Sequence, residues 1–312
     1  MKLAFVFPGQ GSQSVGMMDA WKDHAVSMEV LEKAGKALGE DLISLIANGP
    51  AEQLNLTTNT QPVMLASSIA MFAAWQAAGG PQPSLMAGHS LGEYAALTAA
   101  GSIELEDAVR AVRVRADAMQ AAVPVGTGAM AAILGLEDDA VIAACEQSAQ
   151  GEVVEAVNFN APSQVVIAGH KGAVERAIEA AKAAGAKRAV LLPVSAPFHS
   201  SLLKPAAAVL QETLSKIEIK SPQIPVIHNV DVQVHTDPVE IRQALVDQAW
   251  HPVRWAQTIE AMAQQGITHV VECGPGKVLT GLVKRINPNL VGLSINDPAS
   301  LVSVMETLRN AS

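Results

Sequence analysis

Short apolar segments alternate with helical segments along most of this chain, and that alternation limits the possible folds more than any other feature. Lys2–Phe7 and Ser84–Gly88 have the length and apolar content of buried strands. Helical patterns occupy much of the chain up to about Gly79 and return in Leu91–Ala100 and Glu104–Ala122. Strands that are joined through helices pair in parallel, because the crossover returns the chain to the same end of the sheet. The pattern therefore predicts an α/β fold in which helices flank a parallel sheet.

The order of elements changes near Pro124 and returns to the first pattern after Phe198. In between, the expected order is strand, helix, strand, strand, helix, strand, at Ala129–Leu134, Asp138–Ser148, Val153–Asn158, Gln164–Ala168, Ala173–Ala184 and Arg188–Pro193. This βαββαβ order is the ferredoxin-like motif. We therefore predict a small ferredoxin-like domain at 124–196, inserted into a large hydrolase-like α/β domain made of 1–123 and 197–312. The second part of the large domain is expected to hold strands at Ile224–His228, His269–Glu272 and Val291–Ile295, with helices at about 202–214, across 237–265, from Val278 onward and at the C-terminal end.

The composition argues against several classes of function. Hydrophobic residues make up 49% of the chain and aromatic residues only 3%, so a large and mostly aliphatic core can be buried. The net charge of −9 argues against a nucleic-acid-binding protein, which needs a basic field. An acidic protein partner remains compatible with this charge if a local basic patch attracts it.

The cysteines and the apolar segments indicate a cytoplasmic protein without a membrane segment. Cys145 and Cys273 are far apart and form no C-x-x-C pair, so we expect reduced, buried thiols and no metal site. The apolar run Leu3–Phe7 is too short for a secretory signal, whose apolar part needs roughly 7–15 residues. Pro62–Ala78 is rich in Ala and contains polar residues, so a core helix is expected there rather than a membrane span.

The segment Gly88-His89-Ser90-Leu91-Gly92 matches the pattern G-x-S-x-G and lies between an expected strand and an expected helix. A nucleophile elbow needs this arrangement, because the sharp turn exposes the serine hydroxyl above the sheet and the glycines relieve crowding. The N-terminus of the following helix directs free N–H groups toward the site. The pattern predicts Ser90 as a nucleophile, with His89 pointing away from it. The alternative is an ordinary turn in which Ser90 caps the helix.

A serine nucleophile needs a base, and histidine is the usual one. His199 ends the segment Ser195–His199, where the small domain returns to the large one, and junctions of this kind commonly line a cleft. The alternative is a loop histidine without a catalytic role. A hydrolase-type triad would use Asp231 as the acid with His251 or His269 as the base, but one of these histidines begins a strand and the other lies between helices. We therefore favour a serine–histidine pair whose imidazole is oriented by a main-chain carbonyl.

Two glycine-rich loops do not match the nucleotide-binding motifs. Pro8–Gln13 lacks the lysine of a P-loop and the third glycine of a dinucleotide fingerprint, and Gly274–Lys277 matches neither pattern. Loops of this kind can still bring a backbone N–H group close to a bound substrate.

The arginines of the expected helix Glu104–Ala122 are candidates for binding an anion. Arg110 lies off the apolar stripe of this helix, whereas Arg113 and Arg115 flank it on opposite sides, so periodicity does not choose between these two. A guanidinium at the rim of a pocket suits a carboxylate, because it donates two parallel hydrogen bonds. The alternative for each arginine is a solvated surface charge.

Several longer motifs follow one another along the chain, namely FVFPGQGSQ (Phe5–Gln13), GHSLGEY (Gly88–Tyr94), Arg115 with Met119-Gln120, GTGAMAAI (Gly126–Ile133), NFN (Asn158–Asn160), VVIAGHK (Val165–Lys171), NVDV (Asn229–Val232) and GPGKVLTGL (Gly274–Leu282). With these motifs in this order, the chain resembles the bacterial malonyl-CoA:acyl carrier protein transacylases of type II fatty-acid synthesis nearly from end to end. The resemblance implies a cytoplasmic acyltransferase that moves malonyl from malonyl-CoA to the phosphopantetheine thiol of acyl carrier protein. It implies a ping-pong mechanism through a serine ester. It also implies that the enzyme is a monomer and uses no cofactor, since malonyl-CoA counts as a substrate.

The resemblance also implies a role for each matching position. Ser90 would be acylated, His199 would be its general base, and the main-chain carbonyl of Gln248 would orient the imidazole. The backbone N–H groups of Gln10 and Leu91 would form the oxyanion hole.

For the acyl group, the resemblance selects Arg115 rather than Arg113 as the residue that holds the malonyl carboxylate. Met119 and Asn160 would be its neighbours in the pocket. In related acyltransferases of polyketide synthesis, a phenylalanine at the position of Phe198 goes with malonyl and a smaller serine with methylmalonyl. The physical reason would be that the ring crowds the space that an α-methyl group needs.

The carrier protein of this family is acidic, so a basic docking patch is expected on this acidic chain. The candidate residues are Lys187, Arg188, Lys204, Lys284 and Arg285, and the alternative for each is an ordinary solvated charge. Three rival functions remain: a serine esterase or thioesterase, a non-catalytic acyl-binding or scaffold protein, and a trans-acting acyltransferase that loads polyketide carrier proteins.

Overall fold

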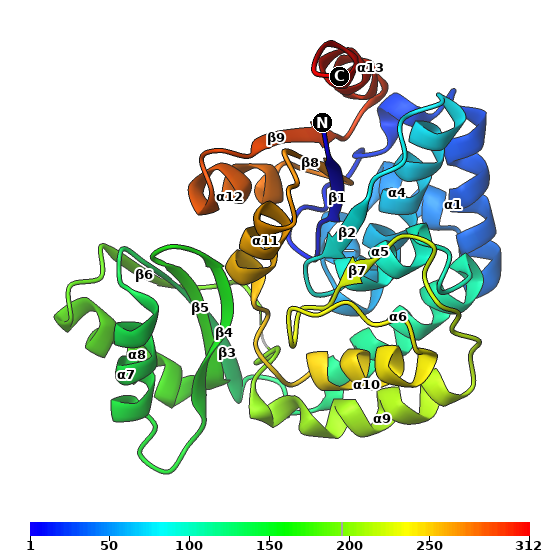
Figure 1. Cartoon of the computed structure of the whole chain (residues 1–312). Coiled ribbons are helices and arrows are strands. Elements are labelled where there is room, and N and C mark those ends of the chain that lie inside the picture. Colours follow the sequence, from blue (N-terminus) through cyan, green and yellow to red (C-terminus); the bar gives the residue numbers. More distant parts are fainter. Residues whose placement is uncertain (195) are drawn as a thin grey trace.

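The computed structural model of the chain describes residues 1–194 and 196–312, so Ser195, the first residue of the segment that carries His199, lies outside the described residues. A parallel five-stranded sheet lies between two layers of helices, and a separate antiparallel sheet of four strands carries two helices on one face (Figure 1). This architecture confirms the predicted fold class, a parallel sheet flanked by helices with a ferredoxin-like unit beside it.

The strands of the large sheet follow the order β7-β2-β1-β8-β9, and all of them are parallel. Their bounds are β1 (Leu3–Phe7), β2 (Leu85–Gly88), β7 (Val226–Ile227), β8 (His269–Cys273) and β9 (Val291–Ile295). β1 lies in the centre and pairs with β2 on one side and β8 on the other. The loops that follow these three strands therefore leave the same end of the sheet, which is where ligands bind in open α/β sheets.

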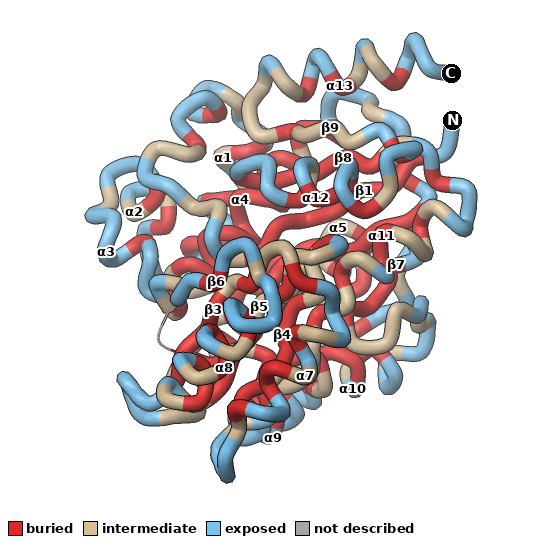
Figure 2. Tube along the Cα trace, turned by 90° about the vertical axis from the view of Figure 1, so that its left-hand side faces the viewer, coloured by how far each residue is buried: buried red, intermediate tan, exposed pale blue. Residues whose placement is uncertain are grey.

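Alternate residues of β1 face opposite helical layers, as the two-residue period of a strand requires. Phe5 and Phe7 pack into the larger part of the core, and Ala4 and Val6 pack into the smaller part on the other face. The buried zone runs through β1 and β8 in the middle of the molecule (Figure 2). Because both faces of the sheet are covered, its central strands are apolar on both faces.

The larger layer contains α1 (Ala25–Leu38), α2 (Leu42–Asn48), α3 (Ala51–Leu54), α4 (Thr57–Ala77), α5 (Gly92–Ala99), α6 (Leu105–Ala121), α9 (Lys204–Ser215), α10 (Pro238–Gln248) and α13 (Pro298–Asn310). The smaller layer contains α11 (Trp255–Gln264) and α12 (Val278–Ile286). Short 3₁₀ helices lie at Asp19–Trp21 and Ser201–Leu203.

The most apolar long segment of the chain, Pro62–Ala78, falls almost entirely within α4, whose buried residues run from Thr57 to Trp75. The expected core helix is therefore present. In the described parts of the chain, no helix is long and apolar enough to cross a membrane. Cys145 and Cys273 are free and buried, as the sequence predicted.

The antiparallel sheet has the ferredoxin-like order β4-β5-β3-β6, with β3 (Gly128–Leu134), β4 (Val154–Ala161), β5 (Gln164–His170) and β6 (Arg188–Leu191). On one face, α7 (Asp138–Ser148) and α8 (Lys171–Ala183) cover a core that includes Ala131 and Ile133. The opposite face presents Met130 and Val166 to the candidate site. The division of the chain into domains at 124–196 stays a prediction.

Two backbone hydrogen bonds attach this sheet to the rest of the protein. The Val253 N–H donates to the Val157 carbonyl oxygen over 2.8 Å, and the Phe159 N–H donates to the Val253 carbonyl oxygen over 3.0 Å. Val253 thus pairs with Asn158 of β4 as an isolated parallel bridge. The bridge fixes β4 against the segment that joins α10 to α11.

Most strands differ by one or two residues from the sequence prediction, and the larger differences in β7 and β4 have a local cause. β7 covers Val226–Ile227 rather than Ile224–His228, because it is an edge strand that pairs only with β2 and because Pro225 has no N–H to donate. β4 extends beyond the predicted Val153–Asn158, since two register shifts let its pairing with β5 continue. Irregularities of this kind redirect side chains next to active sites.

Candidate active site

The chain turns sharply at Ser90, between the end of β2 and the start of α5. Ser90 has a φ of 53°, in the left-handed region that residues other than glycine seldom adopt. A Cβ atom on Gly88 would lie 1.8 Å from the Gly92 carbonyl oxygen, and one on Gly92 would lie 2.2 Å from the Phe7 carbonyl oxygen. Only glycine fits at these two positions, so the turn can pack against β1 and expose the serine hydroxyl in the way a nucleophile elbow does.

The imidazole of His199 lies against the hydroxyl of Ser90, although 109 positions separate the two residues in the sequence. Ser90 Oγ and His199 Nε2 are 2.7 Å apart, and His199 Nδ1 is 2.7 Å from the main-chain oxygen of Gln248. A carbonyl oxygen only accepts hydrogen bonds, so Nδ1 carries the hydrogen and Nε2 accepts the one from the serine hydroxyl. His199 also has a positive φ, 65°, so both members of the pair have strained backbone.

Burial, and then the positive charge of Arg115, lower the pKa of His199 to about 3. The side chain is 3% exposed. A neutral imidazole is the form that can accept a proton from serine, so the histidine is ready to act as a base at neutral pH.

The residues of the alternative hydrolase-type triad lie elsewhere and have other partners. Asp231 Oδ2 is 2.7 Å from His235 Nε2, and His251 Nδ1 is 2.7 Å from the main-chain oxygen of Asp247. His269 Nδ1 is 2.8 Å from the hydroxyl of its neighbour in the sequence, at the start of β8. These contacts do not assemble an acid–histidine pair next to the elbow.

Arg115 is buried at 1% exposure and reaches the nucleophile from α6. One terminal nitrogen donates to Ser90 Oγ over 3.2 Å and to the side-chain oxygen of Gln248 over 2.8 Å, and the other donates to the side-chain oxygen of Gln61 over 2.7 Å. All these acceptors are neutral, and in the described residues Nε has no partner. The buried Glu93 carboxylate acts on Arg115 electrostatically, but among the described residues no carboxylate forms an ion pair with the guanidinium. Burying a cation without a paired anion is costly, so an anionic ligand at this place would supply a direct partner.

The other two arginines of α6 face away from this position. Arg113 forms an ion pair with Glu40 at 2.5 Å and donates to the main-chain oxygen of Thr58. Arg110 pairs with Asp107 on the same helix. Of the two arginines that periodicity left open, Arg115 therefore lines the cavity and Arg113 binds elsewhere, and the role of Arg115 in binding a carboxylate stays a prediction.

A cavity of about 210 Å³ opens in front of the elbow. One part of its wall comes from the large sheet and its helices and includes Gln10, Ser90, Leu91, Arg115 and Met119. The other part comes from the antiparallel sheet and the segment after it and includes Met130, Asn160, Val166, Phe198 and His199. The structure thus brings the predicted nucleophile, the predicted base, the predicted oxyanion donors and the predicted acyl-pocket residues to one place.

Gln10 and Leu91 border the cavity next to Ser90. Among the backbone hydrogen bonds of the described residues, neither the Gln10 N–H nor the Leu91 N–H donates to a main-chain oxygen. Leu91 directly precedes the first residue of α5, where N–H groups have no acceptor within the helix. Both N–H groups are therefore available to an oxygen atom that develops negative charge in the cavity.

His89 also borders the cavity, with its ring against Asn160 and Trp255. Its Nε2 is 2.7 Å from the side-chain oxygen of Asn160, and burial lowers its pKa, so the ring is neutral. It supports the wall formed by β4, and the hydroxyl of Ser90 is bonded to His199 instead.

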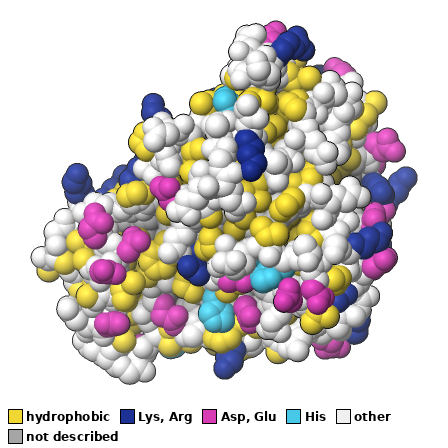
Figure 3. All heavy atoms as spheres, viewed as in Figure 1, with side chains coloured by type: hydrophobic (Ala, Val, Ile, Leu, Met, Phe, Trp, Pro, Cys, Tyr) yellow, Lys and Arg dark blue, Asp and Glu magenta, His cyan; other side chains and the backbone are white. Residues whose placement is uncertain are grey.

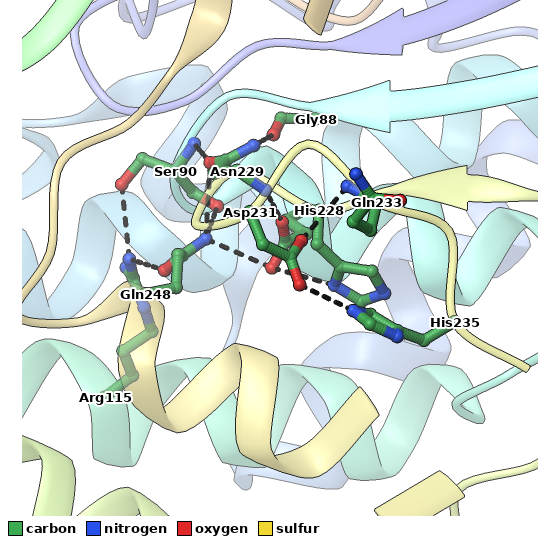
Figure 4. A network of polar contacts seen from close by, with 10 residues as sticks. Gly88, Ser90, Arg115, His228, Asn229, Asp231, Gln233, His235 and Gln248 are labelled. Atoms are coloured by element: carbon green, nitrogen blue, oxygen red, sulfur yellow. Dashed lines mark hydrogen bonds and ion pairs between the residues drawn. The ribbon is translucent and has the colours of Figure 1, made fainter. Parts of the chain in front are cut away.

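Several residues of the site were not singled out from the sequence. Gln61 binds Arg115, and Asn158 lines the cavity beside Asn160. Behind the elbow, Asn229 belongs to the polar network of Figure 4, and Glu93 accepts a hydrogen bond from the Asn229 backbone N–H. Asn158, Glu93 and Asn229 occur within the quoted motifs, so their motif membership was the available signal.

The candidate docking residues are all exposed, but their surroundings differ. Lys204 lies over the ring of Trp250, with 5.2 Å between Nζ and the ring centroid. Arg285 donates to the side chain of Gln164 and to the main-chain oxygen of Pro162, so it links α12 to the antiparallel sheet. Acidic side chains gather over α7 and α8 (Figure 3), including Asp138, Asp139, Glu146, Glu175 and Glu179.

The described residues contain no group of three or more His, Cys, Asp or Glu side chains that could hold a metal ion.

Comparison with known proteins identifies the family. The chain matches the acyl transferase domain family over residues 4–302. It is 54% identical over 306 residues to the malonyl CoA-acyl carrier protein transacylase of Escherichia coli strain K12, with 98% of this chain and 99% of that one covered. The structure of the acyl-carrier-protein S-malonyltransferase from Burkholderia pseudomallei is 62% identical with a TM-score of 0.97, over 98% of this chain and 100% of that one.

A second solved structure is a malonyl-transacylase in complex with a type II PKS acyl-carrier protein. It is 51% identical to this chain with a TM-score of 0.97, and the match covers 98% of this chain and 100% of that one. By sequence over its whole length and by structure, the chain belongs to the family of malonyl-CoA–acyl carrier protein transacylases.

Proposed function

We propose that this chain transfers a malonyl group from malonyl-CoA to the phosphopantetheine thiol of acyl carrier protein, for fatty-acid synthesis, through an ester on Ser90. The observation that carries the proposal is the buried guanidinium of Arg115, 3.2 Å from the Ser90 hydroxyl and without a carboxylate partner among the described residues. In a malonyl thioester, one methylene separates the carboxylate from the reacting carbonyl. Such an acyl group needs a cation within a few ångströms of the nucleophile.

In the first half-reaction, Ser90 Oγ attacks the thioester carbonyl carbon while His199 Nε2 takes the hydroxyl proton. The developing oxyanion accepts hydrogen bonds from the Gln10 and Leu91 N–H groups, and each such donor is worth roughly 3–4 kcal/mol. The carbon–sulfur bond then breaks, and the imidazolium returns its proton to the sulfur of coenzyme A. The main-chain oxygen of Gln248, 2.7 Å from Nδ1, holds the imidazole in the required tautomer and supports its charged form.

In the second half-reaction, the pantetheine thiol of the carrier protein loses its proton to His199 and attacks the ester carbonyl. The carbon–oxygen bond to Ser90 breaks, and the proton passes back to the serine oxygen. The same base, oxyanion donors and carboxylate clamp serve both halves, because the two tetrahedral intermediates have the same geometry.

The acyl pocket accounts for selectivity. Arg115 holds the malonyl carboxylate through two charged hydrogen bonds. Met119 and Asn160 border the space around the acyl chain, and the ring of Phe198 occupies the volume that an α-methyl group would need. The pocket therefore favours malonyl over acetyl by charge and over methylmalonyl by size.

The carrier protein approaches the open side of the cavity as an acidic partner, and Lys187, Arg188, Lys204, Lys284 and Arg285 are the proposed docking residues. The acidic surface over α7 and α8 disfavours that side for an acidic partner. The proposal includes a monomeric, cytoplasmic enzyme that uses no cofactor. A relative that was solved with a type II PKS acyl-carrier protein supports a second role, loading polyketide carriers by the same chemistry.

Mass spectrometry of the intact protein after mixing with malonyl-CoA tests the proposal, with peptide mapping of the adduct. We expect one malonyl group on the peptide that contains Ser90, none in Ser90→Ala, and an unchanged adduct in the control Ser303→Ala on the exposed part of α13. Adding holo acyl carrier protein should remove the malonyl group far faster than water does. Faster capture by water would indicate a thioesterase, and the absence of any adduct would indicate a non-catalytic acyl-binding protein.

A further inference from the structure

The backbone of Ser90 is held from behind by two side chains that belong to other elements. The Ser90 N–H donates to the side-chain oxygen of Asn229 over 2.8 Å, and the Ser90 carbonyl oxygen accepts from the side-chain nitrogen of Gln248 over 2.8 Å (Figure 4). Backbone in the left-handed region costs about 1–3 kcal/mol for a residue other than glycine, and it persists only where its surroundings impose it. These two bonds are such a restraint on the φ of 53°.

Both of these residues bind one buried carboxylate, that of Glu93 in the first turn of α5, Asn229 through its backbone N–H and Gln248 through its side chain. The Asn229 N–H donates to Glu93 Oε1 over 2.5 Å, and the side-chain nitrogen of Gln248 is 3.4 Å from Glu93 Oε2. The side-chain nitrogen of Asn229 also donates to the Gly88 carbonyl oxygen over 2.7 Å. The Asn229 side chain therefore binds the backbone of the turn at both Gly88 and Ser90. Glu93 is 0% exposed.

The charge of Glu93 has a buried partner in His228, at the end of β7. His228 Nδ1 is 3.5 Å from Glu93 Oε2, and both side chains are 0% exposed. Burial on its own lowers the pKa of His228, but the charges of Glu93 and Asp231 and the contact with Glu93 outweigh it and raise the pKa above its ordinary value. A raised pKa favours the protonated imidazole, which is the form that can pair with the Glu93 carboxylate.

The turn that delivers Asn229 is itself strained. The turn covers residues 228–232, and its last residue, Val232, has a φ of 59°, which is unusual for a β-branched side chain. The Val232 N–H donates to the His228 carbonyl oxygen over 3.0 Å, and the His228 N–H donates to the Gln233 carbonyl oxygen over 3.0 Å. Strained backbone is retained where a precise placement is needed, and this turn places Asn229 against the elbow.

A purely structural role for Glu93 does not account for this arrangement. Buried ion pairs contribute little net stability, and apolar residues of similar size often replace them at no loss. The contacts of Glu93 converge instead on the two residues whose side chains bind the Ser90 backbone. Glu93 accepts from the main-chain N–H of Asn229 and from the side chain of Gln248. Gln248 in addition binds the base through its main-chain oxygen and Arg115 through its side-chain oxygen.

We propose that Glu93 is a positioning residue that acts through Asn229 and Gln248 to hold the nucleophile elbow in its reactive conformation. The inference rests on the proposed role of Ser90 and goes beyond it, because Glu93 touches neither the acyl group nor the base. It predicts a defect in the reactivity of the serine that is independent of the acyl group.

The test compares Glu93→Ala, Glu93→Gln and Asn229→Ala with the wild type, with Glu272→Gln as the matched control. Glu272 is another carboxylate with 0% exposure near a helix N-terminus, where it accepts from Thr280 N over 2.9 Å and from Leu279 N over 3.2 Å, away from the elbow. Three quantities are measured on folded protein, as judged by circular dichroism: kcat and KM for malonyl and for acetyl transfer, and the rate of Ser90 modification by phenylmethylsulfonyl fluoride.

We expect kcat to fall about 100-fold in Glu93→Ala and Asn229→Ala, the loss expected for a misplacement of about 1 Å. Glu93→Gln keeps one of the two acceptor oxygens and should lose about tenfold. KM for malonyl-CoA should stay within about threefold, malonyl and acetyl transfer should fall equally, and the sulfonylation rate should fall in parallel. Combining Glu93→Ala with Asn229→Ala should cost much less than the sum of the two single changes, because both relax the same restraint on the Ser90 backbone.

Wild-type kcat in folded Glu93→Ala and Asn229→Ala, or a change confined to KM, would overturn the inference. Should Glu93→Ala not fold, Asn229→Ala and Glu93→Gln decide by the same criteria. The rate of Ser90 sulfonylation depends on the position of the serine hydroxyl and is measured without malonyl-CoA. It therefore separates a failure of this inference from a failure of the proposed function, which would appear as a wild-type enzyme without a malonyl adduct.

Discussion

The guanidinium of Arg115 donates to the Ser90 hydroxyl over 3.2 Å inside the protein, and the same nitrogen donates to Gln248 over 2.8 Å. Gln248 in turn binds the Ser90 carbonyl oxygen with its side chain and the His199 imidazole with its main chain. One glutamine thus connects Arg115, Ser90 and His199. The position of each of these three groups depends on how α10 packs against the elbow.

Replacing Arg115 by alanine should reduce malonyl transfer strongly and spare acetyl transfer. Removing one partner from a buried charge pair costs about 2–5 kcal/mol, so kcat/KM for malonyl-CoA should fall at least about 30-fold. Acetyl transfer has no carboxylate to lose and should stay the same or rise. Steady-state kinetics with both thioesters checks this outcome.

The control for that experiment is Arg113→Ala. Arg113 lies on the same helix but binds Glu40 and Thr58 outside the cavity, so the ratio of malonyl to acetyl transfer should not change. Equal losses of both activities in Arg115→Ala would remove Arg115 from the carboxylate role.

The acid limb of the pH–rate profile should lie far below the ordinary range of histidine. The pKa of His199 is lowered to about 3 by burial and by the charge of Arg115, so the free enzyme keeps a neutral base as the pH falls from 8 to 5. Because kcat/KM reports the free enzyme, it should be nearly flat over that range. In Arg115→Ala the nearby charge is gone, so the pKa of His199 rises and the acid limb moves to higher pH.

Acetyl-CoA is the substrate for this comparison, since Arg115→Ala retains activity toward it. A wild-type acid limb near 6.5, or identical profiles for the two enzymes, would contradict the electrostatic link between the two residues.

Replacing Phe198 by serine should admit methylmalonyl. The ring borders the cavity, and shape exclusion of one methyl group is worth about 1–3 kcal/mol, so the ratio of methylmalonyl to malonyl transfer should rise roughly tenfold to hundredfold. Competition between the two thioesters, read by the mass of the acylated enzyme, measures this ratio. An unchanged ratio would mean that the ring does not contact the acyl chain.

Reversing the charge of Lys204 and Lys284 should weaken the second half-reaction alone. We expect Lys204→Glu with Lys284→Glu to raise KM for the carrier protein about tenfold at low salt, with a smaller effect at 0.3 M salt as screening shortens the range of the field to about 6 Å. Malonylation by malonyl-CoA should be unaffected. Arg285 is left intact because it also ties α12 to the antiparallel sheet.

The matched control is Lys182→Glu on α8, which covers the face of the antiparallel sheet opposite the cavity. It should leave KM for the carrier protein unchanged. A slower malonylation step in the double variant would show that these lysines bind coenzyme A instead.

Local sequence patterns determined the secondary elements and the elbow. The glycines at 88 and 92 are required by contacts within a few residues or with the neighbouring strand, and a strand followed at once by a helix imposes the turn at Ser90. The βαββαβ order likewise follows from consecutive patterns, because the ferredoxin-like sheet is built from adjacent segments. Contacts between residues that are close in the sequence produce patterns within short segments, so the elbow and the order of elements could be predicted.

The site itself was decided by tertiary structure. Periodicity could not separate Arg113 from Arg115, since both flank the apolar stripe of α6; only the packing of α4 and α10 around that helix turns Arg115 inward to Gln61 and Gln248. No local pattern predicted that Glu93 meets Asn229, 136 positions away, behind the nucleophile. A one-dimensional pattern records which face of an element is buried, whereas the partner it is buried against depends on the order of strands in the sheet and on the packing of helices onto it.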